Sequence, residues 1–237
     1  MTRVSGGGAP VLRGPSFWGR GGYGAVLLDL DGCLIDSNDV HARAWSDALA
    51  RFGHAVAPGR IRPEIGKGGQ EMLRDFVPAA QRHFLGDAMG QLQTRLFLKR
   101  FGRQVRPFPG AASTVRAMKR AGIPVVLASS ADCTVVERAL DRLRLRSVVD
   151  GFTSADDVQK AKPFDDIFSL AISRFGLGAL HPVAIGDTPY DIGAAHQIGI
   201  PCLALLSGGF PERLLAAAEA RFTGLAHLWR DGRHLFR

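Results

Sequence analysis

The stretch AVLLDLDGCLIDS, residues 25–37, determines how the rest of this sequence is interpreted. Its first four residues are apolar, which is typical of a strand buried in a parallel sheet. Asp29 and Asp31 follow at positions i and i+2, and such side chains point to the same side of an extended chain. Gly32 then permits a sharp turn and leaves room for a ligand near the main chain. We therefore predict a strand whose carboxyl end carries two neighbouring carboxylates.

Two adjacent carboxylates repel each other, so this pair indicates a bound cation. Mg²⁺ fits because it prefers oxygen ligands and often bridges carboxylates to phosphate. The alternative is a strand followed by an acidic turn that binds nothing, since short motifs also match by chance. The remaining motifs of the chain decide between the two interpretations.

Composition narrows the class of protein. The chain has 237 residues, 46% of them hydrophobic, which suffices for a sizeable core. No apolar run approaches the ~18 residues of a membrane span, so we expect no membrane partner. Cys33, Cys133 and Cys202 are far apart and odd in number. They argue against a disulfide framework or a zinc site and predict a reducing, cytoplasmic location.

The net charge of +8 is concentrated at the two ends of the chain. Residues 1–22 and residues 221–237 each carry a net charge of +3, which leaves +2 for the middle. The middle has no basic patch interleaved with aromatic residues, as nucleic-acid binding would require. We expect no nucleic-acid partner, and a monomer or homodimer.

Helical patterns without strands occupy the region after the first strand. Apolar residues recur at helical spacing from Val40 to Phe52, around Met72 to Phe76, and from Leu85 to Leu96. The predicted domains are a disordered Gly-, Pro- and Arg-rich leader (1–22), an α/β core (23–37 and 107–222), a helical cap domain inserted into it (38–106), and a basic C-terminal tail (223–237).

Strands and helices alternate from Gly110 onward. The predicted strands lie near residues 123–128, 148–152, 183–185 and 202–206. The predicted helices lie near residues 111–121, 136–143, 164–175, 191–198 and 212–220. This alternation predicts an α/β fold with a doubly wound parallel sheet, in which ligands bind at the carboxyl ends of the strands.

Polar residues follow the predicted strands at these ends. Ser129 ends the second strand, Asp187 ends the fourth, and Lys162 follows the third, just before a helix. Asp191 lies four residues beyond Asp187. We expect these groups to meet Asp29 and Asp31 in one crevice, because together they suit a metal ion, a phosphoryl group and a nucleophile.

With these motifs the sequence resembles haloacid-dehalogenase-superfamily phosphohydrolases of the phosphoglycolate-phosphatase and β-phosphoglucomutase branch. The resemblance covers about residues 24–210 and rests on four motifs in order: Asp29-Leu30-Asp31-Gly32, Ser129 after an apolar strand, Lys162-Pro163, and Gly186-Asp187-Thr188-Pro189-Tyr190-Asp191. The chain departs from the family at Cys33, where the family usually has Thr, and so lacks a hydroxyl near the phosphate loop.

The resemblance implies a role for each of these residues. Asp29 would be the nucleophile that forms a phosphoaspartate, and Asp31 the general acid and then the general base. Mg²⁺ would be held by Asp29, the backbone carbonyl of Asp31, and Asp187, while Asp191 would orient Lys162 or metal-bound water. The implied phosphate-binding residues are Gly32, Ser129, Ser130 and Lys162.

Several of these residues have a structural alternative. Ser129 and Asp191 also suit helix caps. His41 and His196 lie on helical patterns, and we interpret both as structural or exposed. Lys67, in a glycine-rich loop of the insertion, is predicted either to contact substrate or to be a solvated loop lysine.

The predicted function is a Mg²⁺-dependent phosphatase acting on a small phosphorylated metabolite, such as phosphoglycolate or a sugar phosphate. A sugar-phosphate mutase is one alternative, and a phosphonate hydrolase with Lys67 as a Schiff-base lysine is another. A binding or regulatory module without activity is a third, against which the intact set of Asp29, Asp31, Lys162 and Asp187 argues.

Overall fold

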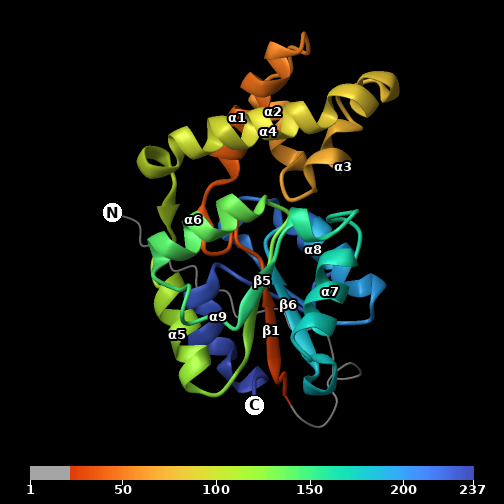
Figure 1. The fold of residues 1–237 in the computed structure, drawn as a ribbon. Coiled ribbons are helices and arrows are strands. Elements are labelled where there is room, and N and C mark those ends of the chain that lie inside the picture. The colour runs from red at the N-terminus through yellow and green to blue at the C-terminus, as the bar shows by residue number, and fades with distance from the viewer. Residues whose placement is uncertain (1–21) are drawn as a thin grey trace.

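A computed structural model describes residues 22–237, so the predicted leader lies outside the described residues except for Gly22. Its main sheet has six parallel strands in the order β5-β4-β1-β6-β7-β8 (Figure 1). The strands are β1 (Ala25–Leu28), β4 (Val125–Ala128), β5 (Gly151–Thr153), β6 (Pro182–Gly186), β7 (Cys202–Leu205) and β8 (Ala220–Phe222).

Helices cover both faces of this sheet, as the sequence predicts for a doubly wound fold (Figure 1). One face packs against α5 (Ala111–Arg120), α6 (Cys133–Leu143) and α9 (Leu225–Gly232). The other face packs against α7 (Asp166–Arg174) and α8 (Pro189–Gln197).

The four apolar residues of strand β1 pack into both cores of the sheet. Val26 and Leu28 belong to the core on the first face, while Ala25 and Leu27 belong to the core on the second. All four are fully buried, because successive side chains of a central strand enter opposite cores. This strand therefore directs the residues that follow it to the middle of the sheet edge.

The prediction of a helix over residues 212–220 is wrong. A short 3-10 helix covers Glu212–Leu215, and strand β8 then pairs in parallel with β7. The alanine-rich sequence favours a helix, but backbone pairing with the open edge of β7 and burial of Ala220 and Phe222 outweigh that local preference.

The C-terminal residues 223–237 are also not a tail. They contain α9, whose Leu225 and Leu228 are buried in the first core. The end of the chain lies beside its described beginning, where Tyr23 pairs with Phe236 in an isolated bridge. Arg230 therefore lies on a helix that packs on the core.

A helical insertion, defined here as residues 38–104, separates β1 from the rest of the sheet. It comprises α1 (Asn38–Arg51), α2 (Pro58–Ile61), α3 (Gly69–Leu73) and α4 (Ala79–Gln104), of which α2 was not predicted. Its two connections to the core pair as a small antiparallel ladder of β2 (Ile35–Asp36) with β3 (Arg106–Pro107). The insertion lies across one end of the sheet (Figure 1).

The insertion has an apolar core of its own, which includes Trp45, Leu49, Met72 and Met89. None of the helices in residues 22–237 combines the length and apolar character needed to cross a membrane.

Candidate active site

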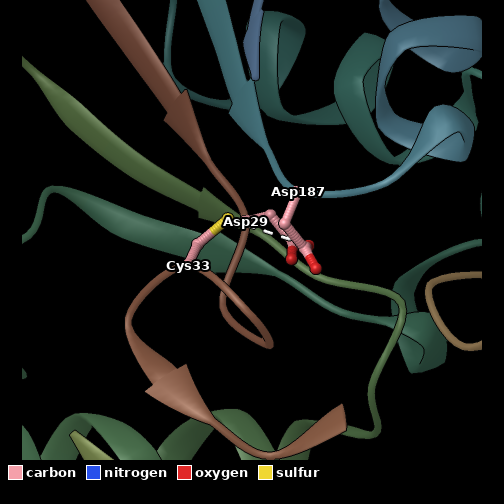
Figure 2. Close-up of side chains that lie close together, drawn as sticks. All are labelled: Asp29, Cys33 and Asp187. Carbon is pink, nitrogen blue, oxygen red and sulfur yellow. Dashed lines mark hydrogen bonds between the residues drawn. The ribbon is translucent and has the colours of Figure 1, made fainter. Parts of the chain in front are cut away.

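Sheet topology brings Asp29 and Asp187 together. Asp29 follows β1 and Asp187 follows β6, and these strands are neighbours in the sheet. Both side chains are buried, and one oxygen of each lies with Cys33 Sγ in a cluster no wider than 4.8 Å (Figure 2). Cys33 Sγ lies 3.8 Å from Asp187 Oδ1, with the thiol as donor. Two carboxylates that are distant in the sequence thus form one buried acidic pair.

The electrostatics of this pair favour a bound cation. Burial raises the pKa of Asp29 to about 7, even though Lys162 opposes the shift. Burial and the Asp29 carboxylate raise the pKa of Asp187 well above its usual value. Both shifts express the cost of holding negative charge in a desolvated site.

Glycines allow the chain to approach Asp187 closely. Gly32 has φ +74°, and a Cβ at Gly32 or at Gly208 would overlap the Asp187 carboxylate. The N–H of Gly32 donates to the Ile35 carbonyl at 2.8 Å, and Gly32 does not line the pocket above the site. The backbone N–H of Gly32 is thus used within the turn, which lets the chain close over Asp187, and the phosphate contact of Gly32 stays a prediction.

Lys162 lies beneath the acidic groups and is 1% exposed. Its Nζ donates to Asp29 Oδ1 at 2.6 Å and to the Ala128 carbonyl at 2.7 Å, and lies 2.7 Å from Asp191 Oδ1. Although burial lowers the pKa of Lys162, the carboxylates of Asp191 and Asp29 raise it overall. The ammonium therefore stays protonated and holds Asp29 in place.

Asp191 both helps to cap helix α8 and contacts Lys162. Its Oδ2 accepts hydrogen bonds from the backbone N–H and the hydroxyl of Thr188, which forms a capping box at the start of α8. Its Oδ1 contacts Lys162. The helix terminus therefore orients the carboxylate that holds the lysine.

The serines after β4 line the pocket beside Asp29. Ser129 Oγ accepts a hydrogen bond from the Ala131 N–H at 3.1 Å, and the cap residue of α6 is Asp132. The alternative of Ser129 as the cap of this helix is thus wrong. Ser130 Oγ is buried and has no hydrogen-bond partner in the described part of the chain. This hydroxyl is available to a ligand.

Three residues at the start of α1 contact the carboxylates of Asp31 and Asp187. The sequence alone did not predict their part in the site. Ser37 Oγ donates to Asp31, and His41 Nε2 lies 3.1 Å from Asp31 Oδ1. Asn38 Nδ2 donates to Asp187 Oδ2 at 2.9 Å. The sequence alone indicates only a structural or exposed role for His41, because a single histidine on an amphipathic helix carries no functional signal without its spatial neighbours.

A pocket between the sheet edge and the helical insertion covers Asp29 and Asp31. Its empty volume of about 690 Å³, part of it open to solvent, is in the range of small-molecule sites. Lys67 lines it, but its Nζ lies 2.5 Å from Glu64 Oε2 and 2.7 Å from Asp75 Oδ2. The lysine is therefore neither a solvated side chain nor a cation free of carboxylate partners.

A parallel sheet that places buried carboxylates and one buried lysine at the carboxyl ends of its central strands defines an α/β enzyme. The chain belongs to the haloacid dehalogenase-like hydrolase family, which matches residues 23–199. The predicted family, the fold class and the prediction of a hydrolase are confirmed.

Individual relatives show how far the similarity extends. The chain is 26% identical over 195 residues to the validoxylamine A 7'-phosphate phosphatase of Streptomyces hygroscopicus subsp. limoneus, covering 82% of this chain and 91% of that protein. It is 29% identical over 204 residues to the phosphoglycolate phosphatase of Escherichia coli, covering 77% and 81%. It is 30% identical over 192 residues to the chloroplastic protein SUPPRESSOR OF QUENCHING 1 of Arabidopsis thaliana, covering 79% of this chain but 18% of that protein.

The solved structures show the same fold. A hydrolase from Pseudomonas syringae superimposes with a TM-score of 0.80 at 24% sequence identity, covering 90% of this chain and 99% of that one. At this identity the match concerns the fold alone.

Proposed function

We propose that this protein is a Mg²⁺-dependent phosphatase that hydrolyses a small phosphorylated metabolite through a phosphoaspartate on Asp29. The observation that carries the proposal is the position of Asp29, held by Lys162 on one side and facing Asp187 on the other. A carboxylate that is fixed, desolvated and open to a pocket is suited to act as a nucleophile.

The donor set fits Mg²⁺. Asp29 and Asp187 offer carboxylate oxygens at one point, and burial raises the pKa of each, so a cation there would stabilise both ionised forms. Asp29, Asp187 and the backbone carbonyl of Asp31 would hold the ion. When bound, Mg²⁺ would neutralise charge on the phosphoryl oxygens and on the two carboxylates.

The residues of this chain would then divide the reaction between them. Asp29 attacks phosphorus, a bond forms between its oxygen and the phosphoryl group, and the bond to the leaving oxygen breaks. Asp31 gives that oxygen its proton. Lys162 offsets the negative charge at the nucleophile, and Ser129 and Ser130 line the pocket where the phosphoryl oxygens would lie.

Hydrolysis of the phosphoaspartate would restore the enzyme. Asp31, having lost its proton, takes one from a water molecule, and the hydroxide attacks phosphorus and releases Asp29. His41 contacts Asp31 and favours its ionised form, which is the form this second step needs.

Names of the relatives support a phosphate ester as substrate, since two of them are phosphatases of phosphorylated small molecules. A mutase would use the same phosphoaspartate and stays an alternative. The phosphonate hydrolase is disfavoured, because Glu64 and Asp75 raise the pKa of Lys67 overall and an ammonium cannot form a Schiff base. The cytoplasmic location and the monomer or homodimer stay predictions.

Phosphate release from p-nitrophenyl phosphate, with Mg²⁺ and with excess chelator, tests the proposal. We expect turnover only with Mg²⁺, and none for Asp29→Asn. Asp47→Asn, which changes an exposed carboxylate on α1, is the matched control and should keep full activity. Turnover in excess chelator, or turnover by Asp29→Asn, would refute the mechanism.

A further inference from the structure

We infer that the enzyme selects phosphate esters of an uncharged alcohol that carries hydroxyl groups, such as a polyol or a sugar, over esters whose leaving group bears a carboxylate or a second phosphate. This inference rests on the proposed phosphatase function and concerns the part of the pocket that holds the leaving group. It separates this chain from a phosphoglycolate phosphatase, whose leaving group is an acid.

The first argument is the state of Lys67. It is the one lysine or arginine that lines the pocket within residues 22–237. Its Nζ contacts both Glu64 and Asp75 and lies 5.3 Å from the centre of the Tyr190 ring. Two carboxylates therefore surround one ammonium, so the charge of Lys67 is already compensated by residues that do not line the pocket. An anionic leaving group would have to displace these partners to obtain a cation.

The second argument is an additional acid on the opposite wall. Asp132 lies at the start of α6 and lines the pocket, and Thr94 of α4 donates a hydrogen bond to it. Burial raises the pKa of Asp132, although the Thr94 hydrogen bond opposes the shift. This carboxyl group repels an acid but accepts a hydrogen bond from a substrate hydroxyl.

The third argument is the apolar surface between these walls. Trp45, Ile65, Met72 and Val135 line the pocket, and Trp45 is 6% exposed. A carboxylate placed against these side chains would lose its water without gaining a partner, which is strongly unfavourable. The C–H face of a polyol or sugar can cover them while its hydroxyls reach polar groups at the rim, among them Thr94 and Asp132.

Matched substrate pairs test the inference directly. The first pair is 2-hydroxyethyl phosphate against 2-phosphoglycolate, and the second is sorbitol 6-phosphate against 6-phosphogluconate. Within each pair the two esters differ only in a CH₂OH or a carboxylate at the same position. We expect the uncharged ester to have the higher kcat/KM in both pairs, by at least about tenfold, the order of one unfavourable contact between like charges.

Variants link the preference to the acids around Lys67. Glu64→Gln combined with Asp75→Asn leaves Lys67 with its charge uncompensated, and should raise kcat/KM for the carboxylate ester of each pair relative to its partner. Lys67→Ala leaves the two acids uncompensated and should lower that ratio further. Asp47→Asn, an exposed acid outside the pocket, should leave the ratio unchanged.

The outcomes separate this inference from the proposed function. Turnover of p-nitrophenyl phosphate together with equal or higher kcat/KM for the carboxylate esters would overturn the inference and leave the phosphatase standing. An unchanged ratio in both the Lys67 and the Glu64–Asp75 variants would also overturn it. Absence of Mg²⁺-dependent turnover with every ester would overturn both.

Discussion

His41 Nε2 lies 3.1 Å from Asp31 Oδ1, so the first helix of the insertion contacts the predicted general acid directly. The other ring nitrogen of His41 lies 3.0 Å from Gln93 Nε2 of α4, and the ring stacks on Phe97 at 3.7 Å between centroids. Burial alone would raise the pKa of Asp31, but His41 and Ser37 lower it overall. Through His41 the insertion thus favours the ionised form of a carboxyl group in the core.

Replacing His41 by Gln should change the pH dependence of the reaction. Asp31 must carry a proton to protonate a poor leaving group, so kcat/KM for an alkyl phosphate falls as the pH rises above the Asp31 pKa. His41→Gln removes the main influence that lowers this pKa, so the pKa rises and the falling limb of the profile moves to higher pH. The measurement is kcat/KM for an alkyl phosphate against pH.

Two controls isolate this effect. The same profile with p-nitrophenyl phosphate should not move, because nitrophenolate leaves without a proton. His196→Gln changes a histidine that contacts Glu219 away from the pocket and should leave both profiles unchanged. A falling limb that stays in place for the alkyl phosphate, or moves to lower pH, would contradict this role of His41.

Residues that follow strands could be predicted because sheet topology alone decides where they lie. Asp29, Ser129 and Asp187 each come directly after an apolar strand, and parallel strands end at the same edge. Lys162 also contacts Asp29, as its order in the motif set implies. The positions of Asp29, Ser129 and Asp187 therefore needed only the alternation of strands and helices, whereas that of Lys162 needed the motif order.

The contributions of the insertion could not be predicted in the same way. His41, Gln93 and Thr94 reach the site through the packing of α1 and α4 over the sheet edge, which no periodic pattern encodes. Strand β8 was missed for a related reason, since its alanine-rich approach has helical propensity and only pairing with β7 makes it a strand. Local sequence patterns do not predict structure or side-chain position where tertiary contacts determine them.

Lys162→Met should destabilise the protein strongly. The variant leaves Asp29 and Asp191 buried without their shared cation, and such a loss typically costs about 3–5 kcal/mol in free energy of unfolding. Adding Asp191→Asn to Lys162→Met should recover part of that loss, because one uncompensated charge disappears. Urea unfolding of both variants measures the difference.

Lys119→Met is the matched control, since Lys119 pairs with Asp150 at a partly exposed site. Exposed ion pairs contribute at most about 1 kcal/mol, so this variant should change stability little. Equal losses in the two single variants, or no recovery in the double variant, would show that Lys162 does not compensate buried carboxylates.

Mg²⁺ should stabilise the folded protein apart from any effect on turnover. An ion that relieves the repulsion between Asp29 and Asp187 binds only the folded state, and at a concentration one hundred times its Kd it adds about 2.7 kcal/mol. For a chain of this size that corresponds to a rise in Tm of roughly 5–10 °C. Thermal unfolding with Mg²⁺ and with chelator measures it.

Asp187→Asn provides the control for this measurement. Removing one charge of the pair should raise the Tm in chelator, because the repulsion is gone, and should abolish most of the shift on adding Mg²⁺. An unchanged Mg²⁺-induced rise in Tm in Asp187→Asn would place the ion elsewhere.

Ca²⁺ should support less turnover than Mg²⁺, since its larger size admits extra ligands and displaces the nucleophile.

Asp31→Asn should separate the two chemical steps. An alkyl alcohol needs the proton of Asp31 to leave, and losing a general acid typically costs ~10²–10⁴-fold in rate. Nitrophenolate does not need it, so with p-nitrophenyl phosphate the variant should still form the phosphoaspartate on Asp29. The second step should then stall, because the introduced amide cannot take a proton from water. The expected trace is a burst of about one nitrophenol per enzyme followed by slow turnover.

Asp29→Asn should give no burst, because the nucleophile itself is missing. The Asp31→Asn variant keeps the backbone carbonyl proposed to hold Mg²⁺, and the Mg²⁺-induced rise in Tm, measured in the same variant, should therefore remain. If the rise persists while aryl and alkyl phosphates slow equally and no burst is seen, Asp31 does not act first as acid and then as base. A burst that Asp29→Asn lacks would assign the nucleophile to Asp29 and the activation of water to Asp31, and a larger rate loss with the alkyl phosphate would assign the leaving-group proton to Asp31.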